Sequence, residues 1–360
     1  LLFRGDFWRV RKMLPASIAP AAPSGRIAVI IPARNEADVI AQTITSLLTQ
    51  SCSVCIFLVD DGSTDGTAEA ARKAAGHTTN LTIIEGQALP AGWSGKLWAV
   101  QQGIERARGI APRFFLLTDA DIVHAPENIA TLVSIAETGG YDLASFMVKL
   151  YCGTLAEKFL VPAFVFFFFM LYPPAWVRDP RRSIAGAAGG CILIRPATLE
   201  RAGGLAAIRG EIIDDCALAR AVKSSGGRVW LGMTESAASA RPYQSFAEAG
   251  RMISRTAFNQ LHHSVWLLLL SLAGLTVTYL LPPALLLSAQ RWPSLLGALA
   301  WLLMTAAYLP MVRFYRLNFL WALALPLIAV FYMCATLHSA VRYWSGSGGL
   351  WKGRVQDPAR

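Results

Sequence analysis

The segment from Phe114 to Asp121 constrains the fold of this chain more than any other. It reads Phe-Phe-Leu-Leu-Thr-Asp-Ala-Asp, an apolar run of strand length that stops at two carboxylates two positions apart. Such a run suits a strand buried on both faces of a parallel sheet, where ligands bind beyond the carboxyl ends of the strands. Asp119 and Asp121 are therefore predicted to share Mg²⁺ or Mn²⁺ with a bound diphosphate. For this motif alone, a polar turn that closes the strand is the alternative.

Three further apolar runs alternate with predicted helices upstream of this strand. The predicted strands are 27–31, 55–59 and 81–84, and the predicted helices are 37–49, 64–75 and 97–108. Strands that alternate with helices are typical of a parallel, doubly wound sheet. Polar clusters at 32–36, 60–61 and 119–121 follow three of the strands, and in such a sheet they meet at one edge. The sequence therefore predicts one site built from three clusters.

Apolar residues are concentrated in the C-terminal third of the chain. The whole chain is 54% hydrophobic, and the segments 265–287, 295–312 and 319–341 are each long enough to cross a bilayer. Segment 159–177 is shorter and contains three prolines, so we expect an interfacial or re-entrant segment, with a buried core helix as the alternative. The net charge of +10 comes without a basic nucleic-acid-binding motif, which favours a membrane surface and phosphorylated substrates over nucleic acid.

These patterns predict four regions along the chain. They are a juxtamembrane linker (1–25), an α/β domain (26–260), transmembrane helices (261–345) and a basic C-terminal tail (346–360). Leu1 and Leu2 are interpreted as the end of an N-terminal hydrophobic segment that precedes this sequence. The positive-inside rule favours the α/β domain and the tail on the same, cytoplasmic side, which needs an even number of crossings. Three candidate segments leave that number open.

The strand-end motifs resemble those of the family 2 glycosyltransferases, which have the GT-A fold. The resemblance rests on Ile-Pro-Ala-Arg-Asn-Glu, Val-Asp-Asp-Gly-Ser-Thr-Asp-Gly-Thr and Thr-Asp-Ala-Asp, and it extends over residues 27–260. It implies an α/β, Rossmann-like catalytic domain with a mostly parallel sheet, followed by C-terminal transmembrane helices. It also implies a nucleotide-sugar pocket formed by Pro32, Arg34, Asn35, Glu36, Asp60, Asp61, Lys96 and Asp119, with the metal on Asp119 and Asp121. For Lys96, a solvated loop lysine is the alternative.

A second acidic pair supplies the catalytic base that this resemblance implies. Asp214 and Asp215 are followed by Cys-Ala-Leu, and Asp215 aligns with the family's catalytic aspartate. Inverting transfer needs a group that accepts the proton of the attacking hydroxyl. Asp214 is the alternative assignment, and two acids that merely complement a helix dipole are a further one. Asp214 is also an acceptor-side candidate, together with Gly189 and Gly190 of a glycine-rich stretch.

The stretch Arg251–Thr256 departs from the family pattern. Processive members carry Gln-x-x-Arg-Trp, whereas Arg255 is followed here by Thr256. This departure favours transfer of a single sugar over polymer synthesis. Arg255 is predicted to bind the leaving diphosphate, because a guanidinium group matches phosphate geometry. A juxtamembrane anchor is the alternative role.

The layout looks closest to hopene-associated glycosyltransferases and to ceramide glucosyltransferase-like enzymes. That resemblance implies a membrane-bound inverting enzyme that moves one sugar from a nucleotide-sugar, expected to be a UDP-sugar, to a lipid hydroxyl in hopanoid biosynthesis. A sphingolipid-like or polyprenyl lipid is also compatible. It implies a multi-pass protein of the bacterial inner membrane with a cytoplasmic catalytic domain. The alternatives are a polyprenyl-phosphate glycosyltransferase and a non-catalytic scaffold, against which the intact carboxylates argue.

Overall fold

The chain forms two compact units, which are described separately. The computed structural model describes residues 4–15, 25–346, 350–351 and 354–355. The first, which we call the sheet unit, comprises Lys12–Tyr151 and Pro174–Arg241, with the described residues after 349. The second, which we call the helical unit, comprises Leu1–Arg11, Cys152–Pro173 and Pro242–Gly349. Most of the predicted basic tail, and residues 16–24 of the predicted linker, lie outside the described residues.

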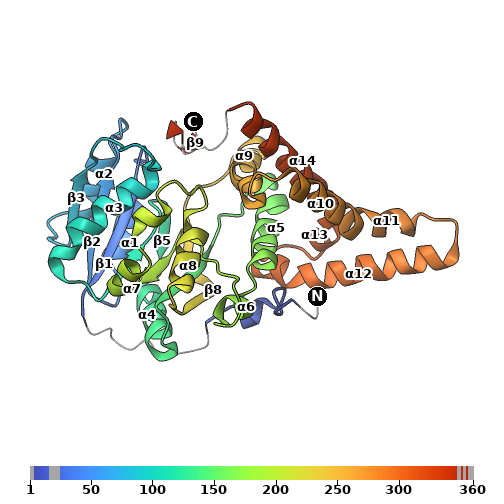
Figure 1. Ribbon diagram of the computed structural model, residues 1–360, viewed down its shortest axis with the longest axis horizontal. Helices are drawn as coiled ribbons and strands as arrows, with labels where there is room; N and C mark the ends of the chain where they lie inside the picture. The colour runs from blue at the N-terminus through green and yellow to red at the C-terminus, as the bar shows by residue number, and fades with distance from the viewer. Residues whose placement is uncertain (1–3, 16–24, 347–349, 352–353, 356–360) are drawn as a thin grey trace. The chain divides into compact units, whose positions relative to one another are not determined.

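The sheet unit is built on one mixed sheet, and eight of the described strands belong to it (Figure 1). In chain order they are β1 Ile27–Ala33, β2 Val54–Asp60, β3 Leu81–Glu85, β4 Phe114–Leu117, β5 Ile122–His124, β6 Leu143–Lys149, β7 Ile192–Ile194 and β8 Val229–Ser239. Their order across the sheet is β3-β2-β1-β4-β7-β6-β8-β5. The first four pair in parallel, as do β6 and β8, while β7 and β5 run antiparallel to their neighbours. The prediction of a mostly parallel sheet is confirmed.

Helices connect these strands at the predicted places. In the sheet unit they are α1 Ile40–Leu48, α2 Thr67–Ala75, α3 Gly95–Ala107, α4 Asn128–Gly139, α6 Pro174–Arg178, α7 Pro196–Arg201 and α8 Asp214–Ser224. Short 3₁₀ turns lie at η1 Val10–Lys12, η2 Arg108–Ile110 and η3 Leu205–Ile208, and β9 Leu350–Trp351 pairs with β10 Arg354–Val355. All seven residues of β1 are buried, which is the reason that its sequence shows no polar alternation.

The helical unit contains the apolar C-terminal segments and part of the chain's middle. Its elements are α5 Leu155–Leu171, α9 Phe246–Ala257, η4 Asn259–Leu261, α10 Val265–Leu275, the π-helical turn η5 Thr276–Leu280, α11 Leu281–Leu286, α12 Arg291–Phe314, α13 Leu320–Leu323 and α14 Leu325–Trp344. Because α5 and α9 pack on the C-terminal helices, the division differs from the predicted boundary at residue 260.

Among the described residues, four helical stretches are long and apolar enough to cross a membrane. They are Leu155–Arg178, Val265–Leu286, Arg291–Phe314 and Leu325–Trp344. The segment predicted at 159–177 is longer than expected and has the length and hydropathy of a membrane-crossing helix. The strands before and after it, β6 and β7, pair in one sheet, so a single crossing would separate paired strands, and the interfacial or re-entrant segment stays a prediction. Thr154 and Glu157 form a capping box that starts α5 early, and the helix continues through Pro162. It is the most buried of the four, in agreement with the alternative of a buried helix.

Gly103 lets α3 approach the sheet closely. A Cβ atom at this position would lie 2.5 Å from Ile30 Cγ2 and 3.1 Å from Val59 Cγ2. Both side chains are buried, so neither has room to move away.

Gly103→Ala is therefore expected to destabilise the sheet unit by about 1–3 kcal/mol through overpacking. The measurement is chemical unfolding of the full chain in detergent. Gly109→Ala is the matched control, because nothing lies within 4 Å of its added methyl group. Equal stability of the two variants would contradict the packing of α3 described above.

Candidate active site

The predicted polar clusters meet at one edge of the sheet. β2, β1 and β4 are adjacent and parallel, so the segments that follow them leave the sheet on the same side. These segments carry Pro32–Glu36, Asp60–Asp61 and Asp119–Asp121. The structure thus brings together residues up to 89 positions apart, as the alternation of strands and helices predicts.

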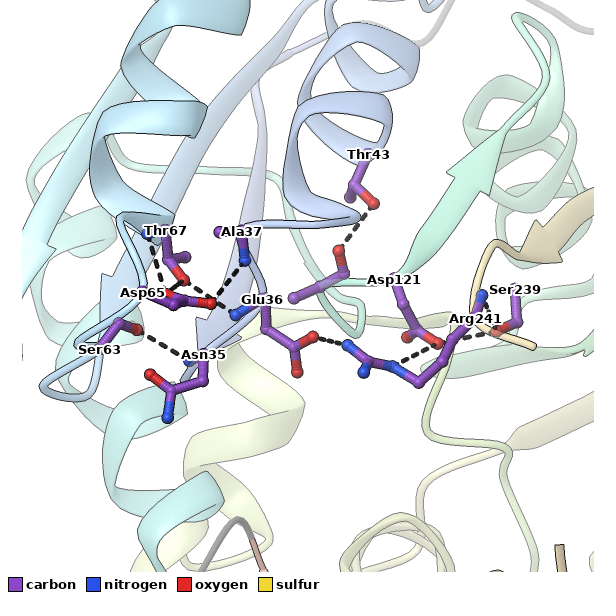
Figure 2. Close-up of polar contacts among 11 residues, drawn as sticks. Asn35, Glu36, Ala37, Thr43, Ser63, Asp65, Thr67, Asp121, Ser239 and Arg241 are labelled. Carbon is purple, nitrogen blue, oxygen red and sulfur yellow. Dashed lines mark hydrogen bonds and ion pairs between the residues drawn. The ribbon is translucent and has the colours of Figure 1, made fainter. Parts of the chain in front are cut away.

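The loops after β1 and β2 are tied together by hydrogen bonds (Figure 2). Three backbone N–H groups of the first loop donate to side chains of the second: Asn35 to Ser63 Oγ (3.0 Å), Glu36 to Thr67 Oγ1 (2.9 Å) and Ala37 to Asp65 Oδ2 (3.0 Å). Asn35 takes a φ of 54°, a region that asparagine tolerates better than most residues. The sequence motifs Arg-Asn-Glu and Asp-Gly-Ser-Thr-Asp therefore form one rigid frame.

The paired aspartates after β2 have different surroundings. Asp61 is only 2% exposed, and Arg34 Nη1 donates to its backbone oxygen and lies 3.4 Å from its Oδ2. Asp60 Oδ1 accepts a hydrogen bond from the Ser63 N–H at 2.9 Å. The contact between Arg34 and Asp61 thus stabilises the frame, while Asp60 is the last residue of β2.

Lys96 is a partly buried ammonium group, its side chain 20% exposed, and not the solvated lysine of the alternative interpretation. It lies in the first turn of α3, after the cap residue Ser94. Its Nζ is 3.0 Å from Asp119 Oδ1 and 3.4 Å from Asp214 Oδ2. Burial alone would lower the pKa of Lys96, but these two carboxylates and Asp215 raise that pKa well above its ordinary value.

Asp215 is held at the N-terminus of α8 by two backbone groups. Its Oδ1 accepts from the Cys216 N–H at 2.7 Å, and its Oδ2 accepts from the Gly189 N–H at 2.8 Å. Burial and the adjacent Asp214 raise the pKa of Asp215 to about 6, against the opposing effect of Lys96. A carboxylate with a pKa near the working pH suits a general base.

Two glycines lie where the chain passes Asp215, and an added side chain would be crowded at both. A Cβ atom on Gly189 would lie 3.3 Å from Lys96 Nζ and 3.4 Å from Asp215 Oδ2, and one on Gly190 would lie 3.0 Å from Val148 Cγ2. Gly189 therefore permits close approach of the backbone to charged groups, and Gly190 permits close packing against the apolar side chain of Val148. One pocket lies beside Asp215. Its lining includes Pro32, Lys96, Asp119, Gly189, Asp214 and Asp215.

Arg241 and Ser239 are site residues that the sequence analysis missed. The Ser239 hydroxyl donates to Asp121 Oδ2 at 2.7 Å, and Arg241 Nε lies 4.0 Å from the same oxygen. Arg241 Nη2 also pairs with Glu36 Oε2, so its guanidinium links the loop after β1 to the acidic motif after β4 (Figure 2). The signal was present: Arg241 follows the end of β8, just as the other polar clusters follow their strands.

The acidic motif fits a divalent cation that a phosphate ligand completes. Burial and the neighbouring Asp119 raise the pKa of Asp121, so a cation between the two carboxylates would relieve their repulsion. In the described part of the chain, no group of three or more His, Cys, Asp or Glu side chains is placed to hold a metal ion. Two carboxylates plus substrate phosphates is a usual arrangement for Mg²⁺ and Mn²⁺.

Arg255 is the predicted site residue that the sheet unit does not contain. It lies on α9 of the helical unit, where Arg251 is also exposed. Its predicted contact with the diphosphate stays a prediction.

Comparison with known proteins agrees with this geometry. Residues 28–203 match the family described as glycosyl transferase family 2. These residues belong to glycosyltransferase family 2. An uncharacterised protein of Methanocaldococcus jannaschii is 33% identical over 118 residues, which are 33% of this chain and 44% of that protein. An undecaprenyl-phosphate 4-deoxy-4-formamido-L-arabinose transferase of Salmonella choleraesuis is 30% identical over 127 residues, which are 33% of this chain and 36% of that protein. The chain thus spans less than half the length of these curated relatives.

A solved structure resembles almost the whole chain. A mannosyltransferase from Pyrobaculum calidifontis, in complex with GDP-Man and Mn²⁺, has a TM-score of 0.56 at 21% identity. The similarity covers 97% of this chain and 94% of that one. At this identity it shows the fold: the predicted GT-A architecture, a mixed sheet followed by long apolar helices, is confirmed.

The link made by Arg241 gives a stability prediction. In Arg241→Met the partly buried Glu36 carboxylate loses its cation and faces Asp121, so we expect a loss on the order of 2 kcal/mol at pH 7. Chemical unfolding of the full chain measures this loss. Arg181→Met is the control, because Arg181 pairs with Asp179 at a side-chain exposure of 89% and should leave the unfolding midpoint nearly unchanged.

A double variant tests whether the loss comes from the Glu36 pair. Adding Glu36→Gln to Arg241→Met should recover part of the stability, since the unpaired charge is gone. Strictly additive losses would show that Arg241 stabilises the chain through other contacts.

Proposed function

We propose that this chain transfers one sugar, with inversion, from a nucleotide-sugar to a lipid acceptor at a membrane. The observation that carries the proposal is the pocket lined by Lys96, Asp119, Asp214 and Asp215 at the carboxyl edge of a GT-A sheet. It combines a candidate metal and diphosphate seat with a candidate base. The apolar helices of the same chain favour an acceptor that stays in the bilayer.

Each group of the pocket has a defined task in this proposal. Asp215 accepts the proton of the attacking acceptor hydroxyl, and its raised pKa makes it a competent base at neutral pH. Lys96 keeps Asp119 and Asp214 oriented and offsets their charge. Asp119 and Asp121 would hold Mg²⁺ or Mn²⁺, which supplies Lewis-acid stabilisation to the leaving diphosphate when bound. The frame formed by the loops after β1 and β2 would bind the nucleotide, which we propose to be UDP.

The acceptor is a lipid hydroxyl in our main proposal and a polyprenyl phosphate in the second. One curated relative is named as an undecaprenyl-phosphate transferase, which favours the second. Neither curated relative is named as a hopanoid or ceramide enzyme, so they give no support to the hopanoid acceptor. The chemistry of the base favours the first, because a phosphate monoester is already largely ionised at neutral pH and needs no base. Thr256 follows Arg255 where processive members carry tryptophan, and the absence of a tryptophan there supports transfer of one sugar.

We further propose a multi-pass protein of the bacterial inner membrane with the sheet unit on the cytoplasmic side, where nucleotide-sugars are made. Three of the four candidate spans follow residue 241, an odd number, whereas the distribution of Lys and Arg favours an even number of crossings.

Calorimetric binding of UDP, UDP-sugars and GDP-sugars to the detergent-purified chain, with and without Mn²⁺ or Mg²⁺, tests the donor site. We expect metal-dependent binding that is lost in Asp121→Ala and kept in Asp179→Ala, because Asp179 is an acid that does not line the pocket. Absence of nucleotide binding under every metal would contradict the glycosyltransferase proposal and favour the non-catalytic scaffold.

Asp215 gives a pH prediction and an acceptor test. Because its pKa is raised to about 6, the base is protonated below that pH, and kcat/KM should fall as the pH drops through about 6. Asp215→Asn should abolish transfer to a hydroxyl acceptor while nucleotide binding persists. Transfer to a polyprenyl phosphate at near the wild-type rate in Asp215→Asn would establish the second acceptor. Near wild-type transfer to a hydroxyl would show that Asp215 is not the base.

A further inference from the structure

A buried polar chain lies behind the candidate active site. It consists of Asn128 at the start of α4, His124 in β5 and Thr118 directly before Asp119, and none of the three side chains is more than 2% exposed. Asn128 Nδ2 is 3.0 Å from His124 Nδ1, and His124 Nε2 is 3.0 Å from Thr118 Oγ1. Thr118 Oγ1 is 2.8 Å from the carbonyl oxygen of Gly190. None of these side chains has a task in the proposed reaction.

The donors and acceptors of this chain are consistent with one direction only. The Gly190 carbonyl can only accept, so the Thr118 hydroxyl donates to it and His124 Nε2 donates to Thr118 Oγ1. Burial lowers the pKa of His124 to about 4, which keeps the ring neutral at pH 7 and leaves its one proton on Nε2. Nδ1 of the neutral ring then carries no proton and accepts from Asn128 Nδ2.

The chain ends on the turn that holds the candidate base. Gly189, the neighbour of Gly190, donates its N–H to Asp215 Oδ2 at 2.8 Å. The other side of the turn is fixed by Ser145, whose Oγ accepts from the Ala188 N–H at 2.9 Å and donates to the Ala188 carbonyl. Thr118 therefore supplies the side-chain contact at the Gly190 end of this turn. The Thr118 hydroxyl favours this one conformation of the turn, because a turn with another conformation would leave the buried hydroxyl and the Gly190 carbonyl without hydrogen bonds.

We propose that His124, in its Nε2–H tautomer, is a positioning residue for sugar transfer that acts through Thr118. The pair fixes the Gly189–Gly190 turn, and the turn orients the Gly189 N–H that stabilises ionised Asp215. The role of the turn in catalysis rests on the proposed function, whereas the tautomer and the hydrogen-bond chain do not. A histidine that only fills the core would have no preferred tautomer tied to Asp215.

The kinetic test compares variants that remove or keep the donors. Thr118→Val and His124→Phe should lower kcat by at least about tenfold, with the nucleotide Kd within about twofold of wild type. Thr118→Ser, which keeps a hydroxyl, and His124→Gln, which can place an N–H near the position of Nε2, should recover most of the rate. Ser46→Ala is the matched control: Ser46 Oγ is buried and accepts from the His124 backbone N–H at 3.1 Å, yet it makes no contact with the turn.

The pH profile separates positioning from general destabilisation. The Gly189 N–H favours the ionised form of Asp215, so its loss should move the acid limb of kcat/KM to higher pH in Thr118→Val. The other groups that face Asp215 are Asp214 on its own helix and Lys96 on α3, with Asp119 beyond Lys96, and these variants leave all three unchanged. Ser46→Ala should keep the wild-type profile even where its unfolding temperature falls.

The tautomer is measured without turnover. In the full chain labelled with ¹⁵N-histidine, the resonance that His124→Gln removes should show a protonated Nε2 and an unprotonated Nδ1 between pH 6 and 8. Protonation on Nδ1 would overturn the inference, even where Thr118→Val fails to fold. The inference is also overturned if the wild type transfers sugar and both Thr118→Val and His124→Phe keep its kcat and its pH profile. A wild type with the expected tautomer but no transfer would contradict the proposed function and not the hydrogen-bond chain.

Discussion

The ammonium group of Lys96 among three carboxylates is the interaction on which the candidate site depends. A buried lysine is costly unless opposite charges surround it, and buried carboxylates have the same requirement in reverse. Asp119 and Asp214 meet Lys96 at 3.0 Å and 3.4 Å, and Asp215 adds to its charge environment. Lys96 lies on α3, and its partners lie after the end of β4 and at the start of α8. Their mutual attraction therefore holds the proposed diphosphate seat and the candidate base in one pocket.

The excess of negative charge in that pocket defines what can bind. One lysine cannot balance three carboxylates, and Asp121 lies close by with a raised pKa. Arg241 balances part of this negative charge, because its guanidinium group lies close to both Asp121 and Glu36. A divalent cation that arrives with a nucleotide diphosphate would complete the balance. The site is thus electrostatically suited to a metal-bound nucleotide-sugar and ill suited to a bare anion.

The helical unit has a different physical character, which matches a role in the bilayer. It exposes large apolar side chains such as Trp266, Leu287 and Trp292, each at least 75% exposed, which in water would be unfavourable. α5 is the exception, since most of its length is covered by α9, α12 and α14. Its burial explains why a sequence interrupted by Pro162 still forms a continuous helix: packing against neighbours outweighs the lost hydrogen bond.

Local patterns in the sequence determined the alternation of strands and helices, the apolar segments and the clusters at the strand ends, because burial and backbone hydrogen bonding act over a few neighbouring residues. They placed the family motifs, Asp119 and Asp121 included, and the candidate base Asp215. Only the tertiary structure decided the partners of these groups. Arg241 lies 205 positions from Glu36, and Thr118 lies 72 positions from Gly190. No periodicity connects such pairs, since an ion pair or a hydrogen bond between distant residues exists only after the sheet has brought their strand ends together.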